Sequence, residues 1–360
     1  MEKSELMHAM IVRSSLLLML FILSGCSILF PEPPPPVTTT IPDVEPEPVT
    51  QAEPVLPAEP APVVVPAPVV LPPPPPAPPE PISALVAVVL SDRMPAYSDV
   101  ANALGQHLKN YEVYDLSDHS RTPMEAFASI AESGASAVVA VGLQAAIMAK
   151  RFSTAPVVFS QVFNFRDNDL LSENVKGVAV LPPIALQIDA WRELNPGLRN
   201  VGAIIGAGHE DLIAEAEDAM QEQGIKFHYA IASTDRETLY LFNRLTRDID
   251  GFLLFPDNRI LSRTVLDEMM TYASQHRVQV AVYNESLLRH GALFSVSSVP
   301  SDIASTIVVV LDSFLNDDAR AAPPISKLSD IEIKINPDLA QSFGLDVQKS
   351  AVDISVANTQ

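Results

Sequence analysis

The chain has 360 residues, of which 33 are proline, 13 are glycine and one is cysteine, and its formal net charge is −21. The negative charge argues against nucleic acid as a partner and against a polybasic membrane patch, because both need a basic face. A single cysteine excludes an internal disulfide, a CxxC redox pair and a cysteine-based zinc site.

The N-terminus has the pattern of a signal peptide, in which a basic residue precedes a short apolar run and small residues. The run of roughly ten apolar residues is too short for a transmembrane helix, which needs about 20. It ends in Leu23-Ser24-Gly25-Cys26, which resembles the lipobox of bacterial lipoproteins, where the cysteine is lipidated and becomes the first residue after cleavage. We therefore predict a lipoprotein signal peptide over 1–25 and lipidation of Cys26, with the start codon open between Met1, Met7 and Met10.

The residue after the lipidated cysteine directs membrane sorting in enterobacterial lipoproteins, where Asp retains the protein at the inner membrane. Here that residue is Ser27. The expected location is therefore a lipid-anchored, periplasm-facing position, with the outer membrane favoured over the inner membrane.

A proline-rich segment follows the anchor. Residues 31–81 hold 22 of the 33 prolines, seven acidic residues and no lysine or arginine. Such a segment lacks backbone donors and apolar periodicity, so we predict a disordered linker outside any packed core. At about 3.1 Å per residue in polyproline II it could reach on the order of 150 Å. The expected organisation is a lipid-anchored N-terminus (26–30), a proline-rich tether (31–82), a folded domain (83–347) and a C-terminal tail (348–360).

The folded domain begins with short apolar runs that alternate with segments of helical period. Strands apolar on both faces and separated by single helices predict a parallel sheet covered on both sides. The predicted strands are 83–90, 111–116, 137–141 and 155–160, and the predicted helices are 98–108, 124–133 and 144–152.

The pattern then restarts, which predicts a second lobe of similar construction. After a segment at 176–181, the predicted strands are 201–205, 226–231, 251–255 and 279–283, and the predicted helices are 184–194, 211–223, 236–246, 261–275 and 285–289. A strand at 293–296, a helix at 303–315 and a strand at 331–335 close the domain, and we expect the chain to cross back between the lobes there. The fold class is therefore α/β, with two Rossmann-like lobes.

Enzymatic motifs are absent from the sequence: it contains no HExxH and no GxSxG. The six histidines after the signal peptide are scattered, and we interpret them as surface or helix-end residues. The segment 206–211 follows a strand and opens a helix but lacks a third glycine and carries two acids, which favours a tight turn over a dinucleotide site. We predict no catalytic activity, no cofactor and no metal.

The carboxyl ends of the predicted strands carry polar or glycine-bearing segments. Ligands of parallel sheets bind beyond these ends, where helix N-termini and loop amides point outward. The segments are Ser91-Asp92, 142–144, 160–164, 256–258, 284–285 and 295–298. Their joint position predicts a ligand cleft between the two lobes.

An ordered series of motifs also resembles a known family: the substrate-binding proteins of ABC transporters with the type I periplasmic-binding-protein fold, in the branch that takes up aromatic amino acids and related small molecules. The motifs cover about 84–347 and comprise 137–142, 155–159, 174–178, 193–196, 201–202, 255–258, 280–285, 291–293, 335–340 and 343–345.

The resemblance implies two lobes joined by a hinge of several strand crossings, which close on a small-molecule ligand such as an amino acid. It also implies an ABC permease or another envelope protein as partner. The ligand contacts that it implies are Gly142, Leu143, Gln144, Gln161, Phe163, Asn164, Asp257, Asn258, Asn284 and Glu285.

Two departures from the family bear on the ligand. Phe163-Asn164 and Tyr283-Asn284 stand where the family often has an acidic residue, which weakens the case for a ligand with a free α-ammonium group. Asp257 and Glu285 remain as acids that could hold an ammonium.

The sequence therefore supports two functional interpretations. The leading one is a lipid-anchored periplasmic solute-binding protein of an ABC transport system. The alternative is an outer-membrane lipoprotein that uses the same fold for cell-envelope interaction or regulation, as penicillin-binding-protein activators do, which Ser27 and the long tether would suit.

Overall fold

The computed structural model describes residues 81–316, 322–347 and 354–356, all within the unit that runs from Pro74 to Gln360. The predicted signal peptide, the lipidation site Cys26, the sorting residue Ser27 and almost all of the tether lie outside the described residues. Within the described ranges, no helix is both long and apolar enough to span a bilayer.

Lobe 1 is built on a parallel six-stranded sheet with the order β11-β5-β4-β3-β1-β2. The middle strand β3 reads Ala-Val-Val-Ala-Val and is buried throughout, as expected for a strand covered by helices on both faces. The strands are β1 (Ile82–Leu90), β2 (Leu108–Asp115), β3 (Ala137–Val141), β4 (Val157–Ser160), β5 (Val175–Val178) and β11 (Ile325–Ser326). The helices are α2 (Pro95–Leu104), α3 (Pro123–Ser133), α4 (Leu143–Phe152) and α9 (Pro300–Leu315).

Lobe 2 is built on a seven-stranded sheet with the order β13-β12-β10-β9-β8-β6-β7, in which β12 runs antiparallel to β10. The strands are β6 (Asn200–Gly206), β7 (Lys226–Ala232), β8 (Gly251–Leu254), β9 (Gln279–Val282), β10 (Phe294–Ser298), β12 (Ile331–Ile335) and β13 (Ile354–Val356). The helices are α5 (Ile184–Leu194), α6 (Glu210–Glu222), α7 (Asp235–Leu245), α8 (Arg263–His276), the 3-10 helix η1 (Glu285–His290) and α10 (Pro337–Phe343). Both lobes confirm the predicted α/β class.

Several elements differ in their bounds from the sequence predictions, among them α2, β2 and the C-terminal segment. Helix α2 lies three to four residues earlier than predicted, because Pro95 occupies its first turn and Gly105 caps its end. Strand β2 likewise starts at Leu108, because most of its residues are exposed at the sheet edge and give no apolar run. The segment 348–360, predicted as a tail, contributes β13, which pairs in parallel with β12.

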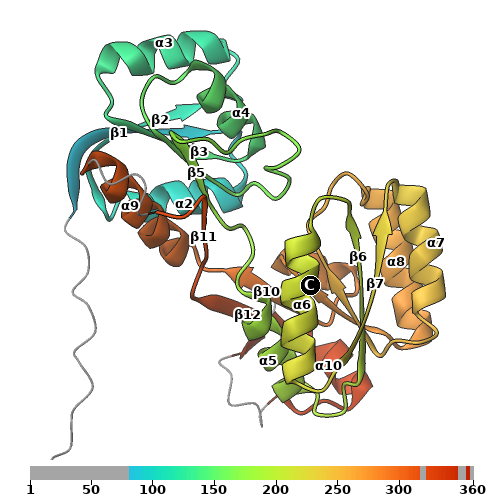
Figure 1. Cartoon of the computed structure of the whole chain (residues 1–360). Coiled ribbons are helices and arrows are strands. Elements are labelled where there is room, and N and C mark those ends of the chain that lie inside the picture. The colour runs from blue at the N-terminus through green and yellow to red at the C-terminus, as the bar shows by residue number, and fades with distance from the viewer. Residues whose placement is uncertain (1–80, 317–321, 348–353, 357–360) are drawn as a thin grey trace, which may run out of the picture. The chain divides into compact units, whose positions relative to one another are not determined.

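The chain crosses between the lobes three times within the described residues: after β5, between β10 and α9, and after β11. Helix α9 packs beside α2 on lobe 1, with Ile307 in the same apolar cluster as Val88 of β1 (Figure 1). The last segments therefore cross back between the lobes, as predicted: α9 and β11 belong to lobe 1, and the chain returns to lobe 2 at β12. The crossings are also bonded to each other, because the Ser298 hydroxyl donates to the Val180 carbonyl (2.9 Å) and Asp302 accepts from the Ser329 amide (2.8 Å).

Trp191 of α5 anchors that helix on the sheet of lobe 2. It is fully buried, its ring meets Phe294 edge-on with centroids 5.2 Å apart, and its Nε1 donates to Gln279 Oε1 at 2.9 Å. A Cβ at Gly251 would lie 2.4 Å from the Trp191 ring, so β8 approaches this helix closely only because residue 251 is glycine.

The Trp191→Ala variant should destabilise lobe 2 by roughly 3–5 kcal/mol, since it leaves a large cavity and an unpaired Gln279 side chain. Urea unfolding followed by far-UV circular dichroism measures this, because Trp191 is the only tryptophan of the chain. Tyr240→Ala on the exposed face of α7 is the matched control, and an equal loss in both variants would contradict the assignment.

Candidate functional site

A cavity of about 420 Å³ opens between the two lobes beyond the carboxyl ends of their strands, and we call it the interlobe cleft. Six of the ten ligand-contact residues predicted from the sequence line it: Leu143, Gln161, Phe163, Asn164, Asn258 and Asn284. The other lining residues are Met94, Ala96, Tyr97, Val162, Val180, Leu181, Pro256, Tyr283, Ser297 and Ser298.

The lobe 1 wall includes the start of helix α4. Gly142 precedes the helix with φ +91°, and a Cβ there would lie 2.6 Å from Ser91 Oγ and 2.8 Å from the Tyr97 ring. The Ser91 hydroxyl accepts from the Ala145 amide (2.9 Å), whereas the Leu143 and Gln144 amides precede the first intrahelical bonds and are available to a ligand. Gly142 therefore shapes the wall without lining it, and the Gln144 side chain is exposed outside it.

Asp257, predicted as a ligand contact, lies behind the cleft wall and is 1% exposed. Arg259 donates to both carboxylate oxygens, from Nε to Oδ1 at 2.9 Å and from Nη2 to Oδ2 at 2.7 Å. The Gly206 amide also donates to Oδ2, at 2.9 Å. Burial alone would raise the pKa of this carboxyl, but these hydrogen bonds outweigh burial and hold the pKa below its usual value. Both oxygens of the Asp257 carboxylate therefore already accept hydrogen bonds from protein donors.

Asn164 connects this carboxylate to the other lobe. Its Nδ2 donates to Asp257 Oδ1 (3.2 Å) and to Asn258 Oδ1 (3.0 Å), and its Oδ1 faces His209 Nε2 (2.9 Å). Because a carboxylate only accepts, the Asn164 amide has one orientation, and His209 must carry its proton on Nε2. We call Asn164, Gly206, His209, Asp257 and Arg259 the Asp257 network.

His209 is buried and stacks on Phe163 with ring centroids 4.4 Å apart. Burial lowers the pKa of His209, and the neighbouring Arg259 guanidinium lowers it further. The sequence interpretation of His209 as a surface or helix-end residue was half right: it is the N-terminal cap residue of α6, but it is buried. Its partners lie 45 or more residues away, so no local signal could have found them.

Two ion pairs extend the attachment of the β4–β5 loop to lobe 2. Arg259 Nη1 lies 2.6 Å from Asp167, and Arg166 Nη2 lies 2.7 Å from Asp211. The turn at 206–211 thus forms part of a lobe contact, in which Asp211 pairs with Arg166 and Glu210 accepts from the Gly208 amide (3.3 Å). This agrees with the interpretation of the segment as a tight turn.

Glu285, the second acid predicted to contact a ligand, is exposed and pairs with Lys334, which also lies 3.3 Å from Glu332. It does not line the cleft. Neither of the two acids that could have held an ammonium group therefore reaches the cleft.

The interlobe cleft is electrically neutral. Among the described residues that line it there is no Asp, Glu, Lys, Arg or His, and the polar members are amides, hydroxyls and phenols. Burial raises the pKa of Tyr283, and burial followed by the charge of Asp92 raises that of Tyr97, so both phenols are uncharged at neutral pH. Neither tyrosine was among the predicted ligand contacts: Tyr283 was noted only as a departure from the family, and nothing in the sequence distinguishes Tyr97 from a core aromatic residue.

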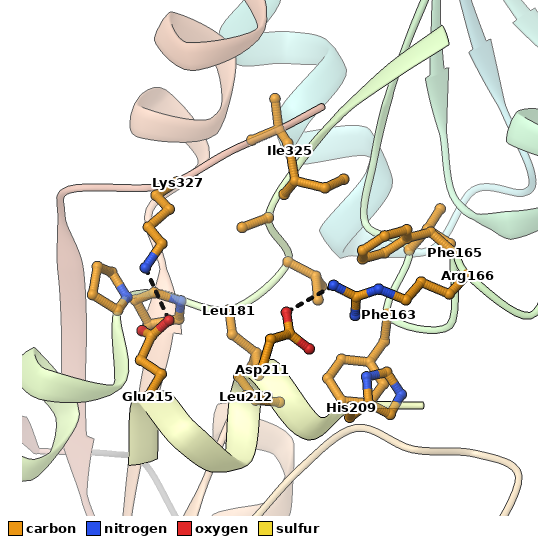
Figure 2. Close-up of a pocket in the computed structure, with 16 residues that line it drawn as sticks. Phe163, Phe165, Arg166, Leu181, His209, Asp211, Leu212, Glu215, Ile325 and Lys327 are labelled. Carbon is orange, nitrogen blue, oxygen red and sulfur yellow. Dashed lines mark hydrogen bonds and ion pairs between the residues drawn. The ribbon is translucent and has the colours of Figure 1, made fainter. Parts of the chain in front are cut away.

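A second cavity, of about 270 Å³, lies beside the hinge, and we call it the hinge pocket. Figure 2 shows its charged residues in pairs, with Arg166 reaching Asp211 and Lys327 reaching Glu215 at 2.9 Å. It shares Val162, Phe163, Val180 and Leu181 with the cleft, so these residues line both cavities.

The family model of the ABC transporter substrate binding proteins matches residues 103–357. The match covers more than half of the chain, so the protein belongs to this family, as its resemblance implied. The family consists of binding proteins and is not a family of enzymes. No curated protein matches the chain.

Solved structures support the same fold at low sequence identity. A conserved domain protein from Vibrio cholerae is 18% identical with a TM-score of 0.54, and an ABC domain from Streptococcus pneumonia in complex with L-Trp is 16% identical with a TM-score of 0.54. The ligand-free, open structure of CD0873 from Clostridium difficile, a substrate binding protein with adhesive properties, is 14% identical with a TM-score of 0.59. Each match covers 77% of this chain and 100% of the other. The fold is thus of the type I periplasmic-binding-protein class.

The folded protein should lose stability as the pH falls from about 7 to about 5, in part through His209. Its pKa is lowered on folding, so between these pH values the unfolded chain binds a proton that the folded chain does not, and stability rises with pH. His209→Gln should show a smaller difference between the two pH values in urea unfolding. His119→Gln, on the exposed surface, measures the effect of removing one imidazole, and an equal change in both variants would refute the role of His209.

Proposed function

We propose that this protein is the solute-binding component of an ABC transport system, which captures a small molecule in the interlobe cleft and delivers it to a membrane permease. The observation that carries the proposal is the cleft itself, which is lined from both lobes beyond their strand ends. Within the part of the chain that the structure describes, three crossings connect the lobes, an arrangement suited to hinge closure around a ligand. Membership of the substrate-binding family supports the same role.

The size of the cleft suits a small organic molecule. Its volume of about 420 Å³ falls within the roughly 300–1,000 Å³ typical of small-molecule sites. A similarly folded domain from Streptococcus pneumonia binds L-Trp, a ligand of this size class. We therefore propose an amino acid or a related compound as the starting class of ligand.

The chemistry of the cleft favours binding over catalysis. The described lining residues include hydroxyls but no histidine, carboxylate or lysine that could serve as a general base. The proposed role is therefore capture and release of an unchanged molecule.

We further propose that the domain faces the periplasm on a lipid anchor at Cys26, with residues 31–82 as its tether. A signal-like segment, small residues and a unique cysteine coincide at this point of the sequence. Ser27 supports anchoring at the outer membrane, and a tether on the order of 150 Å long would let the domain reach across to a permease.

Ligand binding predicts thermal stabilisation of the purified protein. A ligand at 100 times its dissociation constant adds about 2.7 kcal/mol, which scanning fluorimetry against amino acids, nucleosides and small acids would detect. Native mass spectrometry would identify a molecule carried through purification.

Ser297→Trp should abolish the stabilisation by filling the cleft, whereas Ser274→Trp on the exposed face of α8 should keep it. Absence of any bound or stabilising compound in the unaltered protein would contradict the proposal, as would full binding by the Ser297→Trp variant.

Metabolic labelling with palmitate tests the anchor. The unaltered protein should take up label and sediment with outer membranes, and Cys26→Ser should lose both properties because the chain has no other cysteine. Ser27→Ala keeps the cysteine and should remain labelled. Label on the Cys26→Ser variant would show that the lipid is attached elsewhere.

A further inference from the structure

The acids nearest the interlobe cleft are all engaged by protein donors. Asp257 is held by Arg259 and Gly206, and Glu285 pairs with Lys334. Asp92, next to Tyr97, accepts from the Met94 amide at 2.7 Å and is not a lining residue. Among the described residues, no carboxylate lines the cleft.

Two amides of lobe 2 present donors to the cleft. Asn284 accepts from the Ser286 amide through Oδ1 (2.8 Å), which assigns its Nδ2 to the other side of the side chain. Asn258 accepts from Asn164 through Oδ1, and the Asn164 orientation is itself determined by Asp257. Each asparagine thus has its oxygen used by the protein and its NH₂ group left for a ligand.

Lobe 1 also offers donors. The first amide of α4, at Leu143, precedes the intrahelical hydrogen bonds, and Leu143 lines the cleft. The Ser298 hydroxyl donates to the Val180 carbonyl, so its hydrogen is not available. Donors on opposite walls select a molecule that carries acceptors.

Three aromatic side chains supply the apolar part of the surface. Tyr97, Phe163 and Tyr283 line the cleft from the first helix of lobe 1, the β4–β5 loop and the end of β9. Each is partly exposed, as required for contact with a ligand, and flat rings of this kind pack well against a planar molecule.

We infer that the ligand of the interlobe cleft is a planar aromatic molecule with hydrogen-bond acceptors, such as an aromatic carboxylate, and without an ammonium group. This inference rests on the proposed function and narrows its ligand class. A free amino acid would bring an ammonium into a neutral cleft, where losing water without gaining a carboxylate partner is costly. The expected penalty is at least about tenfold in affinity.

Matched pairs of compounds that differ only in the α-ammonium group test the inference. Isothermal titration of the full chain in detergent compares indole-3-propionate with L-tryptophan, and 3-phenylpropionate with L-phenylalanine. The deamino compound of at least one pair should bind, and at least about tenfold more tightly than its amino acid.

A gain-of-function variant provides a second, independent measurement. Asn284→Asp retains an oxygen to accept from the Ser286 amide and adds a carboxylate to the cleft lining. The variant should raise the affinity for the amino acid relative to the affinity for its deamino compound by about tenfold or more. Asn195→Asp is the matched control, because Asn195 caps the Gly197 amide in the same way (3.0 Å) but does not line the cleft, and it should leave the ratio unchanged.

Two outcomes would overturn the inference. Equal or tighter binding of the amino acids by the unaltered chain overturns it and leaves the proposed function standing, because the cleft then binds a zwitterion. Failure of every compound in both pairs also overturns it, and the proposed function is then judged separately from the molecule that copurifies in native mass spectrometry.

Discussion

The burial of one carboxylate, that of Asp257, organises the region where the two lobes meet. A charge with 1% exposure is tolerated only if it is paired and hydrogen-bonded. Its partners come from three places: Arg259 beyond β8, Gly206 at the end of β6 and Asn164 in the β4–β5 loop of lobe 1. The hydrogen bonds to this one carboxylate therefore bring together three strand ends that are distant in sequence. Removing Arg259, the cationic partner, would leave an uncompensated buried charge, which is far more costly than the loss of a surface ion pair.

This arrangement also determines the chemistry of the cleft. Asn164 faces Asp257 and His209 with its amide atoms while it contributes to the cleft wall, and Phe163 stacks on His209 while it lines the same wall. Asp257 and Arg259 pair with each other behind the cleft wall. The polar and aromatic surface that a ligand can contact consists of amides, hydroxyls and aromatic rings. The fold is that of its family, and the ligand class that we infer rests on the neutrality of the cleft lining.

Much of the fold could be predicted from local sequence. The boundaries of 137–141, 184–194 and 331–335 agree with the structure, since buried parallel strands appear as unbroken apolar runs and helix α5 has a clear apolar face. Edge strands were harder: β2 is mostly exposed, and β13 was taken as part of a tail because three residues paired to β12 leave no periodic pattern. Six of the contact residues implied by the family resemblance line the cleft, and they lie at the strand ends, which share one edge in parallel sheets.

By itself, the sequence determined the two-lobed α/β class, the crossings between the lobes in the last segments and the edge of the sheets where the cleft lies, because these follow from the order and periodicity of apolar residues. Only the tertiary structure decided what the acids do. Asp257 and Glu285 looked alike as candidates for a ligand, but one is buried against Arg259 and the other is exposed beside Lys334. The physical reason is that the charge state and availability of a side chain depend on partners in space, and Asn164, His209 and Asp257 meet only after both lobes have folded.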